Sequence, residues 1–211
     1  MTATTPPLTA ALGPRALANR QRIVAVAGDE LRRNPSASME DIAAAAGMVR
    51  RTLYGHFPTR EALIDGMLDE AFEQVGRALD RVDTGQPPAV VVADLAVTLW
   101  AVGDEFCLLL RLDEASSRAR AADRLAPVRG LVVTLVEDGQ ADGTFADHLP
   151  PAAVARVLTA LVLELLNARG NGEWDSVDPA RDAARACLIA AGVDRVTAAG
   201  IALTVAEKHR R

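Results

Sequence analysis

Five polar side chains suited to contact with DNA lie within seven consecutive residues. They are Arg50, Arg51, Thr52, Tyr54 and His56. An arginine can bind O6 and N7 of guanine together, hydroxyl groups can reach phosphates, and a threonine methyl group can touch thymine. These residue types predict recognition of double-stranded DNA. The alternative is a pair of short core helices whose charged face is simply solvated.

Metal and catalytic chemistry have little support in the sequence. None of the three histidines, His56, His148 and His209, has a second ligand three or four residues away, and the chain contains neither a CxxC nor an HExxH motif. Cys107 and Cys187 each lie in an apolar run, which predicts buried free thiols. We therefore expect no catalytic residue, no metal site and no cofactor.

Charge is distributed unevenly along the chain. Residues 1–60 contain eight arginines and four acidic residues, a net charge of +4, whereas the whole chain carries −5. The remaining residues therefore carry −9. This asymmetry indicates a polyanionic partner for the first part alone, although chance clustering would give the same pattern.

A pair of short helices would position the polar side chains. Ser38 can cap a helix of residues 39–46, and Asp41 lies three residues further on, as in an approximate capping box. Gly47 is suited to the turn that follows, and a second helix spans about residues 49–57. This is the arrangement of a helix-turn-helix, whose second helix enters the major groove.

The rest of the sequence also predicts helices. Aromatic residues make up only 3% of the chain, and its many alanines and leucines favour an all-α fold. Apolar periodicity, prolines and glycines delimit further helices at about residues 14–33, 60–82, 89–103, 105–115, 118–137, 151–168 and 179–191. Residues 1–14 are expected to be flexible, and residues 193–211 to form a weakly helical tail. No signal peptide or membrane span is expected, because the longest uncharged run beyond the N-terminus covers only residues 196–206, which favours a cytoplasmic protein.

A family resemblance supports the DNA interpretation. Residues 42–63, IAAAAGMVRRTLYGHFPTREAL, closely resemble the signature of the tetracycline-repressor (TetR) family. The resemblance is strong over about residues 15–68, and beyond that it rests on helix order and length. It implies a helix-turn-helix DNA-binding domain at residues 15–60 and an α-helical effector-binding and dimerisation domain at residues 61–192.

The resemblance also implies roles for individual residues. Thr52, Tyr54 and His56 match positions that meet the DNA backbone or thymine methyl groups. Arg60 matches a basic residue that clamps a phosphate at the start of the fourth helix, and Ser38 matches a capping residue that touches phosphate.

Arg50 and Arg51 occupy the variable positions that read bases in this family. Two residues depart from the family pattern. Val49, counted among the DNA-binding residues, stands where the family has Ser or Ala, so the cap of the second helix is weaker. Gly55 lies in the middle of that helix, at a cost of about 1 kcal/mol relative to alanine.

Two further sets of residues are candidates within the helical domain. An effector pocket between the fourth helix and those that follow would draw on Met67, Phe72, Trp100, Phe106 and Cys107. Ordinary core packing explains the same residues. Two-fold packing of the last strong helices would use Val154, Val157, Leu158, Leu161, Leu165, Ala186, Cys187 and Ala190. Purely intramolecular burial is the alternative.

These expectations describe a homodimeric transcriptional repressor. It would bind a pseudo-palindromic operator and be released by a small, hydrophobic ligand of unknown identity. An activator of the same family, a protein that compacts DNA without specificity and a helical enzyme are the alternatives.

Overall fold

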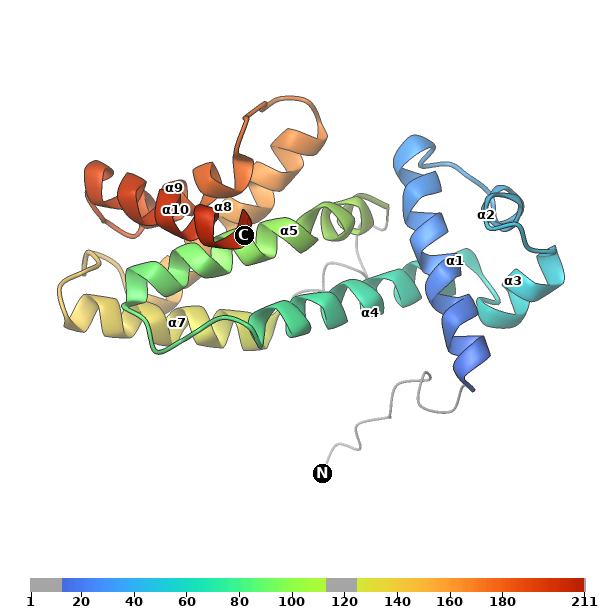
Figure 1. The fold of residues 1–211 in the computed structure, drawn as a ribbon, viewed down its shortest axis with the longest axis horizontal. Helices are drawn as coiled ribbons and strands as arrows, with labels where there is room; N and C mark the ends of the chain where they lie inside the picture. Colours follow the sequence, from blue (N-terminus) through green and yellow to red (C-terminus); the bar gives the residue numbers. More distant parts are fainter. Residues whose placement is uncertain (1–12, 113–124, 211) are drawn as a thin grey trace. The chain divides into compact units, whose positions relative to one another are not determined.

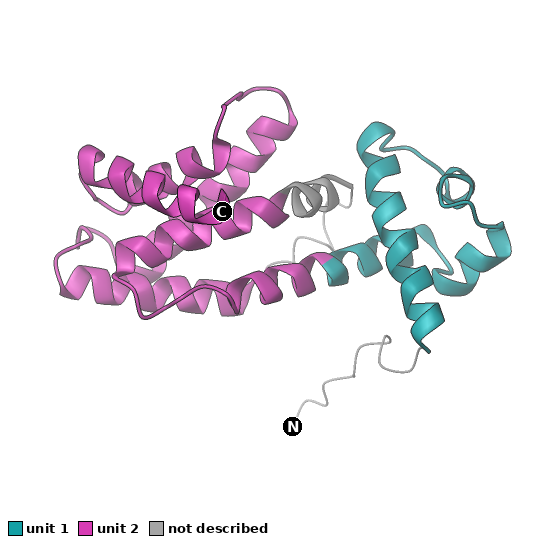
Figure 2. Cartoon of the chain, in the orientation of Figure 1, with its two compact units in different colours: residues 1–70 teal, residues 71–211 magenta. Residues whose placement is uncertain are grey.

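The computed structural model is all-helical where it describes the chain, which is at residues 13–112 and 125–210, with the backbone alone at 104–112. The described residues form nine helices and no strand (Figure 1). The chain divides into two compact units, Met1–Glu70 and Ala71–Arg211, and the division falls within one long helix (Figure 2). The all-α prediction is confirmed.

The first unit contains α1 (Pro14–Arg33), α2 (Met39–Ala45), α3 (Arg50–His56) and the start of α4 (Arg60–Leu79). Proline in the first turn of α1 suits its position, because the amide that proline lacks would have no partner there. All four helices occur where the sequence predicts them, within one to three residues at each end. The fully buried side chains of this unit include Ile23, Leu31, Ile42, Leu53, Phe57, Leu63 and Met67.

Helix α2 begins and ends as its sequence predicts. The amide of Asp41 donates to Ser38 Oγ at 3.2 Å, and the amide of Ser38 donates to Asp41 Oδ2 at 2.9 Å. The hydrogen bonds from Ser38 lower the pKa of Asp41 below its ordinary value. Gly47 follows α2 at φ +62°, a left-handed conformation that favours glycine. The predicted capping box and turn are therefore confirmed.

The second unit consists of the end of α4, α5 (Pro88–Leu112), α7 (Ala126–Ala141), α8 (Pro151–Gly170), α9 (Pro179–Ala190) and α10 (Arg195–Arg210). Helix α5 is central, since it contacts α7, α8, α9 and α10. The prediction of separate helices at 89–103 and 105–115 was wrong, because α5 continues through Gly103. A Cβ atom on Gly103 would lie 2.4 Å from Leu166 Cδ1, so this glycine allows α5 to approach α8 closely.

The C-terminal segment is a packed helix, where the sequence predicts a weakly helical tail. Helix α10 buries Ala198, Ala202, Val205 and Ala206, which recur at helical spacing. A side-chain hydrogen bond also fixes its last turn. His209 Nε2 lies 2.5 Å from Oδ1 of Asp94, a buried carboxylate on α5. Small side chains gave the helix a weak sequence signal, although they allow close packing.

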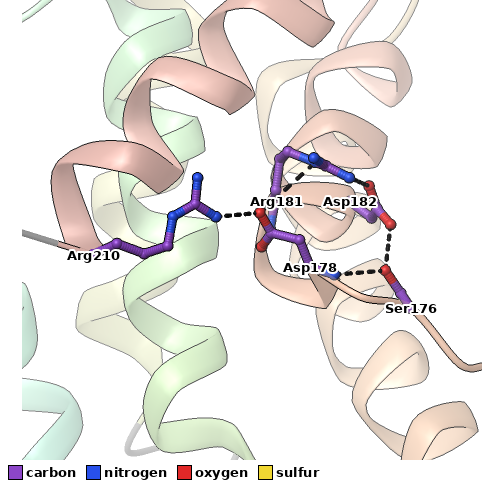
Figure 3. Close-up of polar contacts among 5 residues, drawn as sticks. All are labelled: Ser176, Asp178, Arg181, Asp182 and Arg210. Carbon is purple, nitrogen blue, oxygen red and sulfur yellow. Dashed lines mark hydrogen bonds and ion pairs between the residues drawn. The ribbon is translucent and has the colours of Figure 1, made fainter.

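A polar network joins the ends of α9 and α10 (Figure 3). Asp178 is the N-cap of α9 and accepts a hydrogen bond from the amide of Arg181 at 3.3 Å. Its other oxygen pairs with Arg210 Nη1 at 2.6 Å. The hydroxyl of Ser176 donates to Asp182 Oδ2 at 2.6 Å. The beginning of α9 and the end of α10 are thereby fixed together.

Among the described helices, α8 alone is long and apolar enough to cross a membrane. Core helices of soluble proteins satisfy the same two criteria, so this is weak support for a membrane span. Helix α8 packs against α5, α7 and α9.

Candidate nucleic-acid interface

Helix α3 has an inward and an outward face. Leu53 and, just beyond the helix, Phe57 are buried, whereas Arg50, Arg51 and Tyr54 are exposed. This is the division that a helix needs if it packs on its own unit with one side and enters a groove with the other. The charged residues of α3 are therefore not tucked into the core.

The remaining sequence candidates are all at least partly accessible to solvent. Ser38 and Val49 are exposed, and Thr52, His56 and Arg60 are half-buried. Val49 is the N-cap of α3 and makes no side-chain capping bond, as its departure from the family pattern predicts. A methyl group added at Gly55 would meet nothing within 4 Å. This glycine therefore weakens α3 without serving close packing.

Three arginines of this unit bind backbone carbonyl groups. Arg22 Nη2 donates to the carbonyl oxygen of Ala46, the C-cap of α2. Arg20 Nη1 donates to the carbonyl oxygen of His56 at 3.4 Å, and its guanidinium lies 4.2 Å from the centre of the Phe57 ring. These contacts neutralise the carbonyl ends of α2 and α3 and fix both helices against α1.

Arg60 makes the third set of carbonyl contacts. Its guanidinium donates to the carbonyl oxygens of Ala37 and, at 2.8 Å, Pro35. The planar fork of arginine suits two acceptors at once. Arg60 thus holds the turn between α1 and α2, a role that its sequence position did not indicate.

Three other arginines pair with acidic residues. The pairs are Arg32 with Asp29, Arg33 with Glu30, and Arg50 with Glu40. Six of the eight arginines in positions 1–60 therefore contact either a carbonyl group or an acidic residue. The other two, Arg15 and Arg51, make neither kind of contact with the described residues. Much of the positive charge counted in the sequence therefore has a partner within the protein.

Residues 34–67, which include α2, α3 and the start of α4, match the sequence profile of bacterial regulatory proteins of the tetR family. The chain is a TetR-family protein. It is accordingly a DNA-binding transcriptional regulator. Among curated protein sequences, none matches the chain significantly.

Solved structures share the fold of this TetR-family chain. The TetR family protein CprB from S. coelicolor A3(2) is 20% identical, with a TM-score of 0.69 over 92% of this chain and 99% of that one. The ketosteroid transcriptional regulator KstR2 of Mycobacterium tuberculosis is 19% identical, with a TM-score of 0.64 over 82% and 93%. RolR in complex with resorcinol is 21% identical, with a TM-score of 0.54 over 89% and 94%.

The second unit of the TetR-family chain contains an apolar pocket. Its empty volume is about 460 Å³, which includes space open to solvent. The described residues that line it are Val75, Leu99, Val102, Gly103, Leu125, Val128, Thr159, Val162, Leu163 and Leu166. A smaller pocket shares Leu99, Val128, Thr159 and Val162 with it. Thr159 is the one hydroxyl residue among the described residues of either lining, and its Oγ1 donates to the carbonyl oxygen of Ala155 at 2.8 Å.

Of the five residues proposed from the sequence, the three with described side chains are not among the residues that line these two pockets. Met67 is buried in the first unit and Phe72 is half-buried. Trp100 is buried and packs edge-on against Trp174, with ring centres 5.5 Å apart. The side chains of Phe106 and Cys107 lie outside the described part of the structure. The assignment of these five residues to an effector pocket therefore stays a prediction.

Helix α8 carries two apolar stripes, and the sequence prediction of a dimer interface mixed them. Val154 and Leu158 of α8 and Cys187 of α9 are buried in the core of the second unit, with 2–4% exposure, so they are not available to a partner. Val157, Leu161, Leu165, Ala186 and Ala190 are exposed or half-buried. Ile189, which the prediction omitted, is 39% exposed. Both stripes have the same helical spacing, so periodicity alone could not separate them.

Proposed function

We propose that the chain is a homodimeric repressor that binds a pseudo-palindromic operator through α3 and releases it when a small apolar ligand occupies the second unit. The exposure of Arg50, Arg51 and Tyr54 on one recognition helix carries this proposal. Ser38, Val49, Thr52 and His56 are also accessible and are proposed to contact the DNA backbone. Arg60 would act chiefly through the turn it holds.

Operator symmetry follows from the proposed dimer. Two recognition helices related by a two-fold axis would enter major grooves about 34–36 Å apart, or a multiple of that distance. The exposed apolar faces of α8 and α9 are the proposed contact, because Val157 and Ile189 remain 49% and 39% exposed in the single chain. Exposed apolar residues on adjacent helices are typical of such an interface.

Selection of bound duplexes tests the DNA proposal. The purified full chain is offered a randomised duplex library and, separately, fragments of the genome that encodes it. We expect enrichment of an inverted repeat and a discrete footprint on the enriched fragments. A protein that compacts DNA without specificity would leave no discrete footprint, and a chain that binds no duplex at low salt would refute the proposal. A reporter gene under the enriched fragment then separates repression from activation.

The composition of the pocket favours a ligand with few polar atoms. Among the described residues of its lining, Thr159 is the only hydrogen-bonding side chain, and its hydroxyl proton is already donated to the carbonyl oxygen of Ala155. A ligand rich in polar groups would therefore lose hydrogen bonds to water without replacing them.

Ligand release can be tested with compounds of the kinds named for similar structures. Resorcinol and a ketosteroid serve as probes of contrasting polarity. We expect the steroid skeleton to bind more tightly and to release the enriched duplex, and Leu99→Trp to abolish release while leaving duplex binding intact. If Leu99→Trp leaves release unchanged, the ligand occupies another site.

A further inference from the structure

The carboxylate of Glu40 links α2 to the outward face of α3. It pairs with Arg50 Nη2, and the same oxygen, Oε1, lies 3.4 Å from the hydroxyl of Tyr54. Arg50 and Tyr54 are four residues apart and therefore share one face of the helix. An acidic group thus lies between two of the side chains proposed to meet DNA.

Neither DNA attraction nor stability accounts for an acid at this position. A carboxylate close to phosphates repels them and lowers affinity for every duplex. The side chains of Glu40 and Arg50 are 41% and 67% exposed, and ion pairs this exposed contribute little to stability. The effect of Glu40 should therefore be sought in how it changes Arg50.

The ion pair both orients Arg50 and cancels its charge. A guanidinium has five N–H donors, so a contact through Nη2 leaves others free to bind O6 and N7 of guanine. An arginine already held in one orientation loses less conformational entropy when it binds a base. Since its charge is compensated, the same arginine gains little from phosphates at random sequence.

We propose that Glu40 is a specificity-determining residue of the recognition helix. It holds Arg50 in a base-reading orientation and suppresses the contribution of Arg50 to non-specific binding. This inference rests on the proposed function, because it requires α3 to read base pairs.

The test compares Glu40→Gln with the parent chain and with Arg50→Ala and the double variant. Each protein is used for selection from a randomised duplex library and for titration of a random-sequence duplex at several salt concentrations. Glu30→Gln is a matched control, since Glu30 also pairs with an arginine of the same unit, at 3.3 Å from Arg33. Circular dichroism and thermal unfolding verify that all variants fold.

For Glu40→Gln we expect tighter binding to the random duplex and a salt slope steeper by about one. The preference between the selected and the random duplex should fall by roughly tenfold or more, as expected when one bidentate base contact is weakened. The base position that loses its preference should be the one lost in Arg50→Ala, and the double variant should add no further loss. Glu30→Gln should match the parent in all these respects.

Two results would overturn the inference while leaving the proposed function intact. In the first, Glu40→Gln selects the parent motif with unchanged random-duplex affinity. In the second, it relaxes a position that Arg50→Ala leaves fixed, which would make Glu40 a direct base reader. Failure of the parent chain to select any motif would instead refute the proposed function and the inference together.

Discussion

Gly66 on α4 lies so close to the ring of Phe57 that a Cβ atom at position 66 would be 2.5 Å from Cε1. Phe57 is 1% exposed and follows α3 directly, so its ring has little room to move. This contact brings α4 against the end of α3 and requires glycine at position 66.

Gly66→Ala should therefore destabilise the protein by about 1–3 kcal/mol through overpacking. Gly76→Ala, on the same helix, is the control, because a Cβ atom there meets nothing within 4 Å. The control should be neutral or more stable by up to about 1 kcal/mol, as alanine favours helix. Chemical denaturation followed by circular dichroism measures both, and equal effects would contradict the assignment.

Arg60→Ala should lower the free energy of unfolding by about 1.5–3 kcal/mol, because hydrogen bonds from a charged group to the carbonyl oxygens of Ala37 and Pro35 are lost. Denaturant titration measures the change. If stability is unchanged and the salt slope of DNA binding falls, Arg60 instead contacts phosphate in the way the family resemblance implies.

Arg51→Ala should leave stability within about 0.5 kcal/mol of the parent, because Arg51 is exposed and has no partner among the described residues. Its effect should appear in DNA binding. If Arg51 reads a guanine, the variant loses its base preference at one operator position, and binding weakens by about 1–3 kcal/mol. If Arg51 contacts a phosphate, the salt slope of binding falls by about one for every duplex sequence. Unchanged binding to all duplexes would remove Arg51 from the interface.

Val157→Asp should convert the proposed dimer into monomer, because it places a charge in the centre of the exposed α8 stripe. Sedimentation velocity measures the assembly state, and the monomer should bind the enriched duplex more weakly. Val196→Asp on α10 is the control, since Val196 is 83% exposed and lies outside the proposed contact. A Val157→Asp chain that remains dimeric would place the interface elsewhere.

Stability should decline in alkali, partly through Cys187. Burial raises the pKa of this thiol to about 12 from an ordinary value of 9.0. The unfolded chain loses the proton first, so the stabilising contribution is complete below pH 9 and is lost as the pH rises towards 12. Between these two pH values the free energy of unfolding falls by up to about 1.4 kcal/mol per pH unit because of this thiol.

Cys187→Ala should remove this component, so the difference in unfolding free energy between parent and variant should shrink above pH 9. Denaturation at pH 8 and pH 10.5 measures it, and other groups that titrate there cancel in the comparison. A constant difference between the two proteins would show that the thiol ionises in the folded state.

The helix boundaries of the first unit could be predicted from short sequence patterns. The Ser38–Asp41 capping box, the turn at Gly47 and the prolines between helices act over a few residues, so they predict boundaries directly. Residue roles that depend on tertiary packing were not readable. Nothing in the spacing of Arg22 and Ala46, or of Glu40 and Arg50, reveals that they meet.

The second unit shows the same limit. The inward stripe of α8, with Val154 and Leu158, and the outward stripe, with Val157 and Leu161, have one periodicity and one composition. Which of the two stripes is buried in the core depends on the helices that pack against α8. Gly103 likewise reads as a helix break, whereas its small size is what lets α5 run past Leu166.

The edge-on contact between Trp100 and Trp174 joins the only two tryptophans of the chain, both in the second unit. The only tyrosine, Tyr54, lies on α3 in the first. Intrinsic fluorescence excited at the red edge of the absorption band, where tryptophan alone absorbs, will therefore report on one part of the second unit. A label or isotope confined to tyrosine will report on α3. The two halves of the molecule can thus be followed separately, in one sample and without engineering either.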